Sequence, residues 1–282
     1  MAMIRFAIPR NTRGSYAVLA TLCVAAGAFV GPAAAADFDC VMEPSLVVKL
    51  GSPVSSILSE VNVERGDVVQ KGQVVARIES SVEQALVAAN TTRAESTAEV
   101  EAKQALLDQK TAVIGRKSGL RQLNVTSNQD VENAQADFNV AKQEVELAKL
   151  NRRMAEIELR RSKASLEQRT IRSPIAGIVT QRALGPGEYV RQDGYIAVVA
   201  RVDPLHVEAY LPVRYFGQVK VGQHAIVRPN EPVGGNRSAD VSVVDQVFDA
   251  ASGTFGVRLS LANPANDIPA GLRCRVSFDL SE

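Results

Sequence analysis

Residues 52–57 read SPVSSI and residues 173–178 read SPIAGI, and this repeat decides the fold. The same offset of 121 residues relates two further pairs of segments: Gly66-Asp67-Val68-Val69 with Gly187-Glu188-Tyr189-Val190, and Val75-Ala76 with Ile196-Ala197. Each copy is rich in β-branched residues and is broken by turn signals. We therefore predict two halves of one small β-sandwich, which a long insertion separates in the sequence but not in space.

Gly66 and Gly187 occupy equivalent places in the two copies, and each precedes an acidic residue, Asp67 or Glu188. Glycine adopts positive φ angles without steric cost. We predict that both glycines are structural turn residues and that neither takes part in catalysis.

The insertion, residues 82–169, has the composition of a long helical hairpin. Between Asn128 and Gln168 there is neither glycine nor proline, and large and small residues alternate in a seven-residue repeat. The large positions are Val131, Phe138, Val145, Arg152, Leu159 and Leu166, and the small positions are Ala134, Ala141, Ala148, Ala155 and Ser162. This pattern predicts a coiled coil.

The first arm of the hairpin, from about Val82 to Ser118, has a less regular pattern. One row contains Leu86, Val100, Leu107 and Ile114 but is interrupted by Arg93, and a second row contains Leu106, Val113 and Leu120. Ser80 and Glu83 have the spacing of a capping box. Each arm is predicted to be one helix of about 37–41 residues, roughly 55–60 Å long at 1.5 Å per residue. Helices of that length must project from the sandwich.

Alternating β-branched sequence follows from about Val202 to the end of the chain. Turn signals such as Gly234-Gly235-Asn236 and Asn263-Pro264 divide it into short segments. Several short strands at this spacing predict a small β-barrel. The expected domains are 37–81, an N-terminal strand and first half of the sandwich; 82–169, the hairpin; 170–201, the second half; and 202–282, the barrel.

Residues 1–36 have the pattern of a secretory signal peptide. Arg5, Arg10 and Arg13 precede an apolar stretch from Tyr16 to about Val30, and small residues at 34–36 suit a cleavage site. An uncleaved anchor is the alternative, because a bilayer needs about 20 apolar residues and 16–36 is near that length. In either case we expect the rest of the chain to be exported.

Export bears on the two cysteines that lie outside the leader, Cys40 and Cys274. In an oxidising compartment this pair is a candidate disulfide joining the first strand to the last. The alternative is two unpaired, buried residues.

The split sandwich, the hairpin between its halves and a motif at the hairpin turn resemble the periplasmic adaptor subunits, or membrane fusion proteins, of the HlyD/AcrA type. The resemblance covers about Val47 to Phe278. The family's tip motif is an arginine, three residues, a leucine, six residues and a serine, and Arg116, Leu120 and Ser127 have this spacing. The resemblance implies that these residues, in a tip near 116–127, contact an outer-membrane channel of the TolC type. Ser127 also suits an N-cap, with Asp130 three residues later.

The resemblance further implies an adaptor that links an inner-membrane pump, of the RND or ABC class, to that channel. It also implies self-association into a ring, hexameric in the family. Only about 15 residues separate the leader from the first half of the sandwich, so a membrane-proximal domain is expected to be absent or vestigial. The alternative function is a structural coiled-coil scaffold of the cell envelope that works without a transporter.

The sequence argues against catalysis, cofactors, metals and nucleic acid. His206 and His224 are the only histidines, and both lie in or beside β-patterned segments. There is no phosphate-binding glycine loop and no cluster of metal ligands. A lipoyl or biotin carrier needs an exposed lysine between the two halves, where the insertion stands. After the leader, 29 basic residues balance 31 acidic ones, so no basic surface for nucleic acid is indicated.

Overall fold

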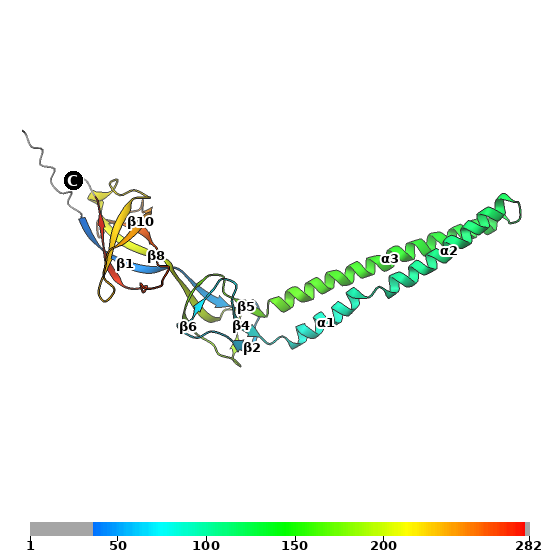
Figure 1. Ribbon diagram of the computed structural model, residues 1–282, viewed down its shortest axis with the longest axis horizontal. Coiled ribbons are helices and arrows are strands. Elements are labelled where there is room, and N and C mark those ends of the chain that lie inside the picture. Colours follow the sequence, from blue (N-terminus) through cyan, green and yellow to red (C-terminus); the bar gives the residue numbers. More distant parts are fainter. Residues whose placement is uncertain (1–35, 280–282) are drawn as a thin grey trace, which may run out of the picture.

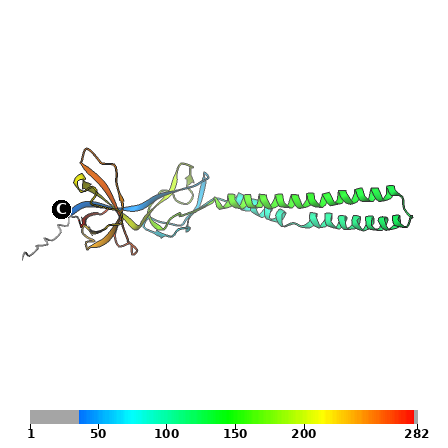
Figure 2. The ribbon, with the colours of Figure 1, turned by 90° about the horizontal axis from the view of Figure 1, so that it is seen from above.

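The computed structural model describes residues 36–279, which form three parts along one axis (Figure 1). A β-barrel lies at one end, a β-sandwich lies in the middle, and a pair of long helical arms projects from the sandwich. Figure 2 shows the same order from a second direction. The predicted signal peptide or anchor lies outside the described residues, apart from Ala36.

The sandwich combines strands from two distant parts of the chain. The first part supplies β2 (Ser56–Val61), β3 (Val68–Val69) and β4 (Val74–Ile78). The second supplies β5 (Thr170–Arg172), β6 (Gly177–Arg182) and β7 (Tyr189–Val190). Strand β2 pairs with β7 and β3 pairs with β6, so each half completes a sheet of the other half.

The hydrogen bonds between the halves repeat with the offset of the sequence. The Gly66 amide donates to the Val179 carbonyl at 2.8 Å, and the Val179 amide donates to the Asp67 carbonyl at 2.9 Å. The same two bonds recur 121 residues later, at the same distances, among Gly187, Leu58 and Glu188. Gly66 and Gly187 have φ angles of 99° and 83°, which residues with a Cβ rarely adopt. The two copies of the sequence repeat therefore form the same pair of backbone hydrogen bonds with each other.

The apolar cores of the sandwich obey the same offset. One buried cluster contains Leu50, Val63, Val69, Val75, Ile175, Val179, Ala197 and Val199. The residues 121 positions away lie in, or pack against, the second cluster: Ile171, Leu184, Val190, Ile196, Val54, Leu58, Ala76 and Ile78. The repeat therefore preserves the packing as well as the turns.

The barrel has six strands and is closed. Its strands are β1 (Ala36–Gly51), β12 (Arg273–Phe278), β9 (His224–Pro229), β10 (Arg237–Val244), β11 (Thr254–Leu261) and β8 (Tyr195–Pro212), in that order, and β1 pairs with β8. A short 3-10 turn, η1 (Val213–Tyr215), follows β8. The predicted barrel is confirmed, but residues 202–282 do not complete it alone, because β1 supplies a strand.

Strands β1 and β8 are long enough to belong to both β-domains. They pair from Cys40 opposite Ala209 in the barrel to Gly51 opposite Tyr195 in the sandwich, with an irregularity between Pro44 and Leu46. This two-stranded ribbon joins the barrel to the sandwich without a single-chain linker.

Cys40 and Cys274 are directly opposite each other on β1 and β12, with their Cα atoms 4.9 Å apart, and their sulfur atoms are bonded. Both side chains are buried in the barrel core. The bond closes a loop between positions 234 residues apart.

The two arms of the hairpin differ in continuity. The returning arm is one helix, α3 (Asn128–Glu167), but the outgoing arm consists of α1 (Ser81–Glu95) and α2 (Ala98–Gln122). The expectation of one continuous first helix was wrong. Thr91 and Thr92 bond back to carbonyls four residues earlier, which weakens a helix. Ser96 then adopts an extended conformation, three residues after Arg93 interrupts the heptad.

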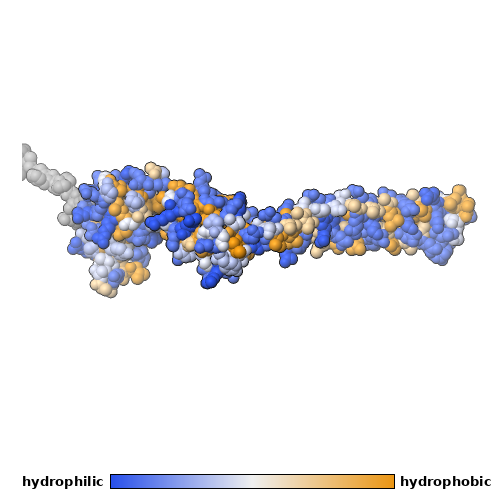
Figure 3. Space-filling model, turned by 90° about the horizontal axis from the view of Figure 1, so that it is seen from below, coloured by the Kyte–Doolittle hydropathy of each residue, from blue (hydrophilic) through white to orange (hydrophobic). Residues whose placement is uncertain are grey.

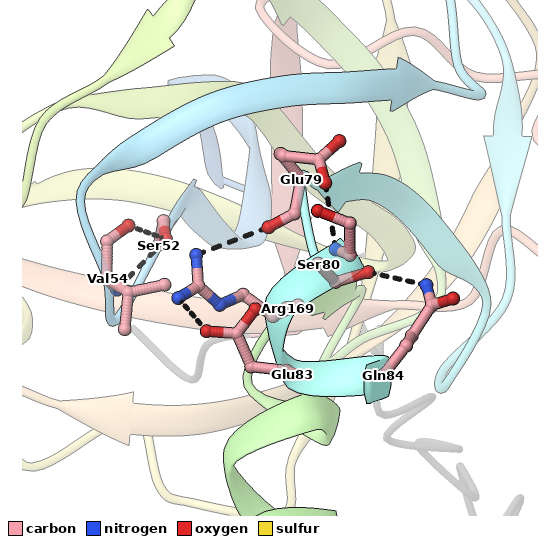
Figure 4. Close-up of polar contacts among 8 residues, drawn as sticks. Ser52, Val54, Glu79, Ser80, Glu83, Gln84 and Arg169 are labelled. Carbon is pink, nitrogen blue, oxygen red and sulfur yellow. Dashed lines mark hydrogen bonds and ion pairs between the residues drawn. The ribbon is translucent and has the colours of Figure 1, made fainter. Parts of the chain in front are cut away.

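The predicted capping box at the start of α1 is also wrong. Ser80 makes no side-chain cap, and its hydroxyl accepts a hydrogen bond from Gln84. Glu83 instead forms an ion pair of 2.5 Å with Arg169, and both side chains are largely buried (Figure 4). The Arg169 guanidinium also donates to the Glu79 carbonyl at 3.3 Å. Arg169 follows the end of α3, so it ties both arms of the hairpin to the edge of the sandwich.

The arms pack through the small residues predicted for α3. The small side chains of α3 are all buried: Ala134, Ala141, Ala148, Ala155 and Ser162. Helix α2, in contrast, contains no buried residue. Ion pairs between the arms join Lys103 to Glu144 at 3.1 Å and Lys110 to Asp137 at 2.7 Å. These pairs define which residues of α2 and α3 stand at the same height along the hairpin.

Gly177 allows β6 to lie against β8, because a Cβ there would overlap the backbone of Ala200. We expect Gly177→Ala to lower the free energy of unfolding by about 1–3 kcal/mol, the usual cost of overpacking. Gly115 in α2 has open space around its Cβ position. Gly115→Ala is the control and should stabilise by up to about 1 kcal/mol, because alanine favours helix. Thermal unfolding measures the stability of both variants. If Gly177→Ala were as stable as the wild-type chain, the close approach of β6 to β8 at this position would be contradicted.

Candidate functional site

The free end of the hairpin contains the three residues of the predicted tip motif. Arg116 and Leu120 lie on α2, and Ser127 is the N-cap residue of α3. All three side chains are exposed. Of the predicted tip near 116–127, residues 116–122 are still helical, and residues 123–127 connect the two helices.

The end of α2 has the hydrogen bonds of a Schellman motif. The Asn124 amide donates to the Arg121 carbonyl at 3.0 Å, and the Val125 amide donates to the Leu120 carbonyl at 2.9 Å. Asn124 has a φ of 59°, a left-handed conformation that asparagine tolerates better than most residues. The turn is therefore a defined structure that fixes where its side chains point.

Arg121 stabilises this turn and was not singled out from the sequence. Its guanidinium donates to the side-chain oxygens of Asn128 and Asn124. The neighbouring Lys117 lies 3.8 Å from Asp130. Arg116 takes part in none of the ion pairs between residues 36 and 279, so its donors face solvent.

Ser127 caps α3, as its spacing to Asp130 predicted. The Asp130 amide donates to the Ser127 hydroxyl at 3.1 Å, and this hydroxyl donates to the Asp130 carboxylate at 2.7 Å. The bond from Ser127, with the positive charge of Lys117, lowers the pKa of Asp130 below its usual value. Ser127 therefore already has a structural role that any partner contact would share.

Apolar side chains surround these polar groups at the tip. Leu123 and Val125 are 72 % and 69 % exposed, and Leu120 is 44 % exposed. Figure 3 shows hydrophobic residues at this end of the hairpin. The sequence analysis missed Leu123 and Val125, although two large apolar residues in a short polar turn are a signal in themselves. Exposed apolar groups beside free donors form a surface suited to a protein partner.

In the part of the chain that the structure describes, no group of three or more histidine, cysteine, aspartate or glutamate side chains is arranged to hold a metal ion. None of the helices between residues 36 and 279 combines the length and the apolar character that crossing a membrane requires.

The split sandwich with a helical hairpin between its halves is also the architecture of a known family. The model of the CzcB-like barrel-sandwich hybrid domain matches residues 46–201, more than half of the chain. The chain belongs to this family. The predicted family is thereby confirmed.

Similar proteins agree in fold. A crystal structure of MacA from Actinobacillus actinomycetemcomitans has a TM-score of 0.72 and 22 % identity, over 86 % of this chain and 78 % of that one. The membrane fusion protein Spr0693 of Streptococcus pneumoniae has a TM-score of 0.58 and 14 % identity, over 88 % of this chain and all of that one. An uncharacterized protein of Haemophilus influenzae is 24 % identical over 217 residues. That match covers 77 % of this chain but only 50 % of the relative.

The cap at the tip makes a prediction about Asp130. Replacing Ser127 with alanine removes the hydroxyl that donates to the carboxylate, so the pKa of Asp130 should rise towards its ordinary value. Because the folded pKa is lowered, the carboxylate stabilises the cap above the ordinary aspartate pKa, and this contribution is lost as the pH falls through the lowered value. NMR titration of Asp130 in both proteins measures the change. An equal pKa in Ser127→Ala would show that the bond is not formed in solution.

Proposed function

We propose that this protein is a periplasmic adaptor that links an inner-membrane transporter to an outer-membrane channel of the TolC type. The observation that carries the proposal is the exposed, structured tip at the end of a hairpin rooted in a rigid sandwich. The adaptor would act by contact and would supply no chemistry of its own. Its cargo would pass through the partners that it joins.

The length of the hairpin supports a bridging role. Helix α3 has 40 residues and is therefore about 60 Å long at 1.5 Å per residue. Figure 1 shows the tip at one extreme of the molecule and the start of β1 at the other. A molecule of this shape can contact one partner at each end while its middle touches neither.

The tip supports contact with a protein surface. Leu123 and Val125 would be buried on docking, which releases water from apolar surface. Arg116 would donate several hydrogen bonds in one plane to carbonyl or carboxylate oxygens. Such acceptors are abundant at the ends of helices, where the last carbonyls lack partners within the helix. We propose this pairing for the periplasmic end of the channel.

The opposite end of the molecule is proposed for the inner-membrane side. Ala36 and Phe278 are paired strand residues at the end of the barrel that is far from the hairpin (Figure 1). The predicted signal or anchor, residues 1–36, ends at Ala36. If this segment stays uncleaved as an anchor, it would hold the barrel, and not the tip, close to the inner membrane and to a transporter of the RND or ABC class.

The test is chemical crosslinking in intact cell envelopes, followed by identification of partners by mass spectrometry. We expect the wild-type chain to recover an outer-membrane channel and an inner-membrane transporter. Arg116→Asp and Leu123→Asp should lose the channel roughly tenfold or more, because each places a charge in the docking surface. Both should keep the transporter, which contacts the other end.

Lys163→Asp is the matched control, since it makes the same charge reversal at an exposed position near the base of α3. It should recover both partners at wild-type levels. Recovery of neither partner by the wild-type chain would contradict the proposal and favour the scaffold function. If all variants recovered the channel equally, the tip would not be the part of the chain that contacts the channel.

A further inference from the structure

The end of the barrel that faces away from the hairpin is formed by two loops (Figure 1). Residues 213–223 join β8 to β9 and begin with η1, and residues 245–253 join β10 to β11. The Val213 amide donates to the Gly253 carbonyl at 3.1 Å, which brings the two loops together. Ala36, the first residue that the structure describes, lies at the same end of the barrel.

Five large apolar side chains on these loops are exposed. They are Val213 (37 % exposed), Phe216 (40 %), Val221 (67 %), Val247 (84 %) and Phe248 (41 %). We name these five residues the barrel-end patch. Phe216 and Phe248 are in edge contact, with ring centroids 4.8 Å apart, and both pack on Phe255. The contact between the rings joins the two loops into one surface.

Closing the end of the barrel explains only part of this patch. Phe255 is buried, and Phe216 and Phe248 cover it, as side chains at the open end of a barrel must. Val221 and Val247 contribute little to that core, because most of each side chain is exposed. Exposed apolar groups that gather on one surface are typical of a contact with a partner.

The loops at the other end of the barrel differ. Residues 230–236 and 262–272 connect the strands there, and the second of these loops lines a cavity together with residues of the sandwich. The large aliphatic side chains of these loops, Val233, Ile268 and Leu272, are buried or half-buried. Apolar exposure is therefore a property of the end that faces away from the hairpin and not of the barrel loops in general.

The charges of the two patch loops balance each other. Arg214 and Lys220 lie on the first loop, and Asp245 and Asp249 lie on the second. Asp249 accepts two hydrogen bonds from its own turn, each of 2.9 Å, and Asp245 lies over Gly256 of β11. Neither Arg214 nor Lys220 belongs to the ion pairs formed between residues 36 and 279. Both bases are therefore available to a partner, while the apolar side chains provide most of the contact.

The position of the patch indicates which partner covers it. Residues 16–36 are close to the length of about 20 apolar residues that a bilayer needs, and they end at Ala36, beside the patch. Where this segment is kept as an anchor, the patch lies at the surface of the bilayer that holds the anchor.

We propose that the barrel-end patch inserts into the headgroup region of a phospholipid bilayer. The valine and phenylalanine side chains would leave water for the boundary between headgroups and acyl chains, and Arg214 and Lys220 would contact lipid phosphates. A second point of contact beside the anchor would limit the tilt of the barrel on the membrane. The inference rests on the proposed function only for the identity of the membrane, which would be the inner one.

The test uses the absence of tryptophan from this chain. Val247→Trp in the full, purified chain places one tryptophan on the patch, and vesicles of phosphatidylcholine and phosphatidylglycerol are the probe. Its fluorescence should shift to shorter wavelength on vesicles and should be quenched by lipids with brominated acyl chains. Val47→Trp is the matched control, because Val47 is also exposed (53 %) but lies in the sandwich part of β1. It should show neither effect. Residues 1–36, where retained, would attach both variants to vesicles, so the difference between the two tryptophans tests the patch.

A second reporter tests the apolar character of the contact. Val221→Trp should respond to vesicles as Val247→Trp does, and adding Val247→Asp to that chain should remove most of the response, because a charge enters the boundary with the acyl chains. The melting temperature should not change, since Val247 is 84 % exposed. Val47→Asp in the same chain is the control and should leave the response intact. The response should also persist on vesicles of phosphatidylcholine alone, because the charges of the loops balance.

Three results would overturn the inference. An unchanged spectrum of Val247→Trp on vesicles would mean that the patch does not enter lipid. Equal responses of Val247→Trp and Val47→Trp would mean that the chain adsorbs without a defined surface. A response that requires anionic lipid would mean that charge, and not apolar contact, causes binding.

These vesicles contain neither a transporter nor a channel, so the result is independent of the crosslinking test of the proposed function. If Val247→Asp lost the transporter in that test while Val247→Trp did not respond to lipid, the patch would bind a protein instead.

Discussion

The backbone hydrogen bonds that the halves of the sandwich give to each other are the constraint on which the rest of the structure depends. Backbone hydrogen bonds join Gly66 to Val179 and, equivalently, Gly187 to Leu58. The partners in each pair are more than 100 residues apart in the sequence. A buried amide or carbonyl left without a partner is costly, so neither half is complete alone. The two ends of the insertion must therefore lie close together in space, at the edge of the sandwich. Its arms match in length, with 15 and 25 helical residues going out and 40 returning.

The same constraint helps to fix the distance between the barrel and the tip of the hairpin. Arg169 joins both arms to the sandwich through Glu83 and the Glu79 carbonyl. The paired strands β1 and β8 extend the sandwich into the barrel, and the bond between Cys40 and Cys274 joins β1 to β12. The position of the tip relative to the barrel then depends mainly on the hairpin. The break at Ser96 between α1 and α2 is the one interruption of backbone helix in its described arms. A protein that bridges two partners needs a hairpin that is held firmly at the sandwich and a tip whose conformation is fixed.

The sequence was most informative where a pattern is long or repeated. The offset of 121 residues predicted the sandwich because each half must present the same turns and apolar positions to the other. The alanine positions of α3 predicted its buried side, since only small residues allow close approach of the arms. The break in the first arm was missed because helix propensity changes little at Ser96 and Thr97, and threonine bonds to the backbone decide the outcome. The role of Glu83 could not be predicted because its partner Arg169 is 86 residues away. At the tip, spacing identified Arg116, Leu120 and Ser127, but the Schellman motif that exposes Leu123 and Val125 depends on the backbone conformation of Asn124.

Hydrogen exchange on a chain without the hairpin tests the central claim most directly. A short glycine–serine linker would replace residues 82–168, and exchange of the backbone amides would be followed by NMR. If the halves hold each other, the amides of Gly66, Val179, Leu58 and Gly187 will remain as slow as in the full chain. Fast exchange of these four amides, with the barrel amides still protected, would show that the hairpin holds the sandwich together. That result would contradict the account.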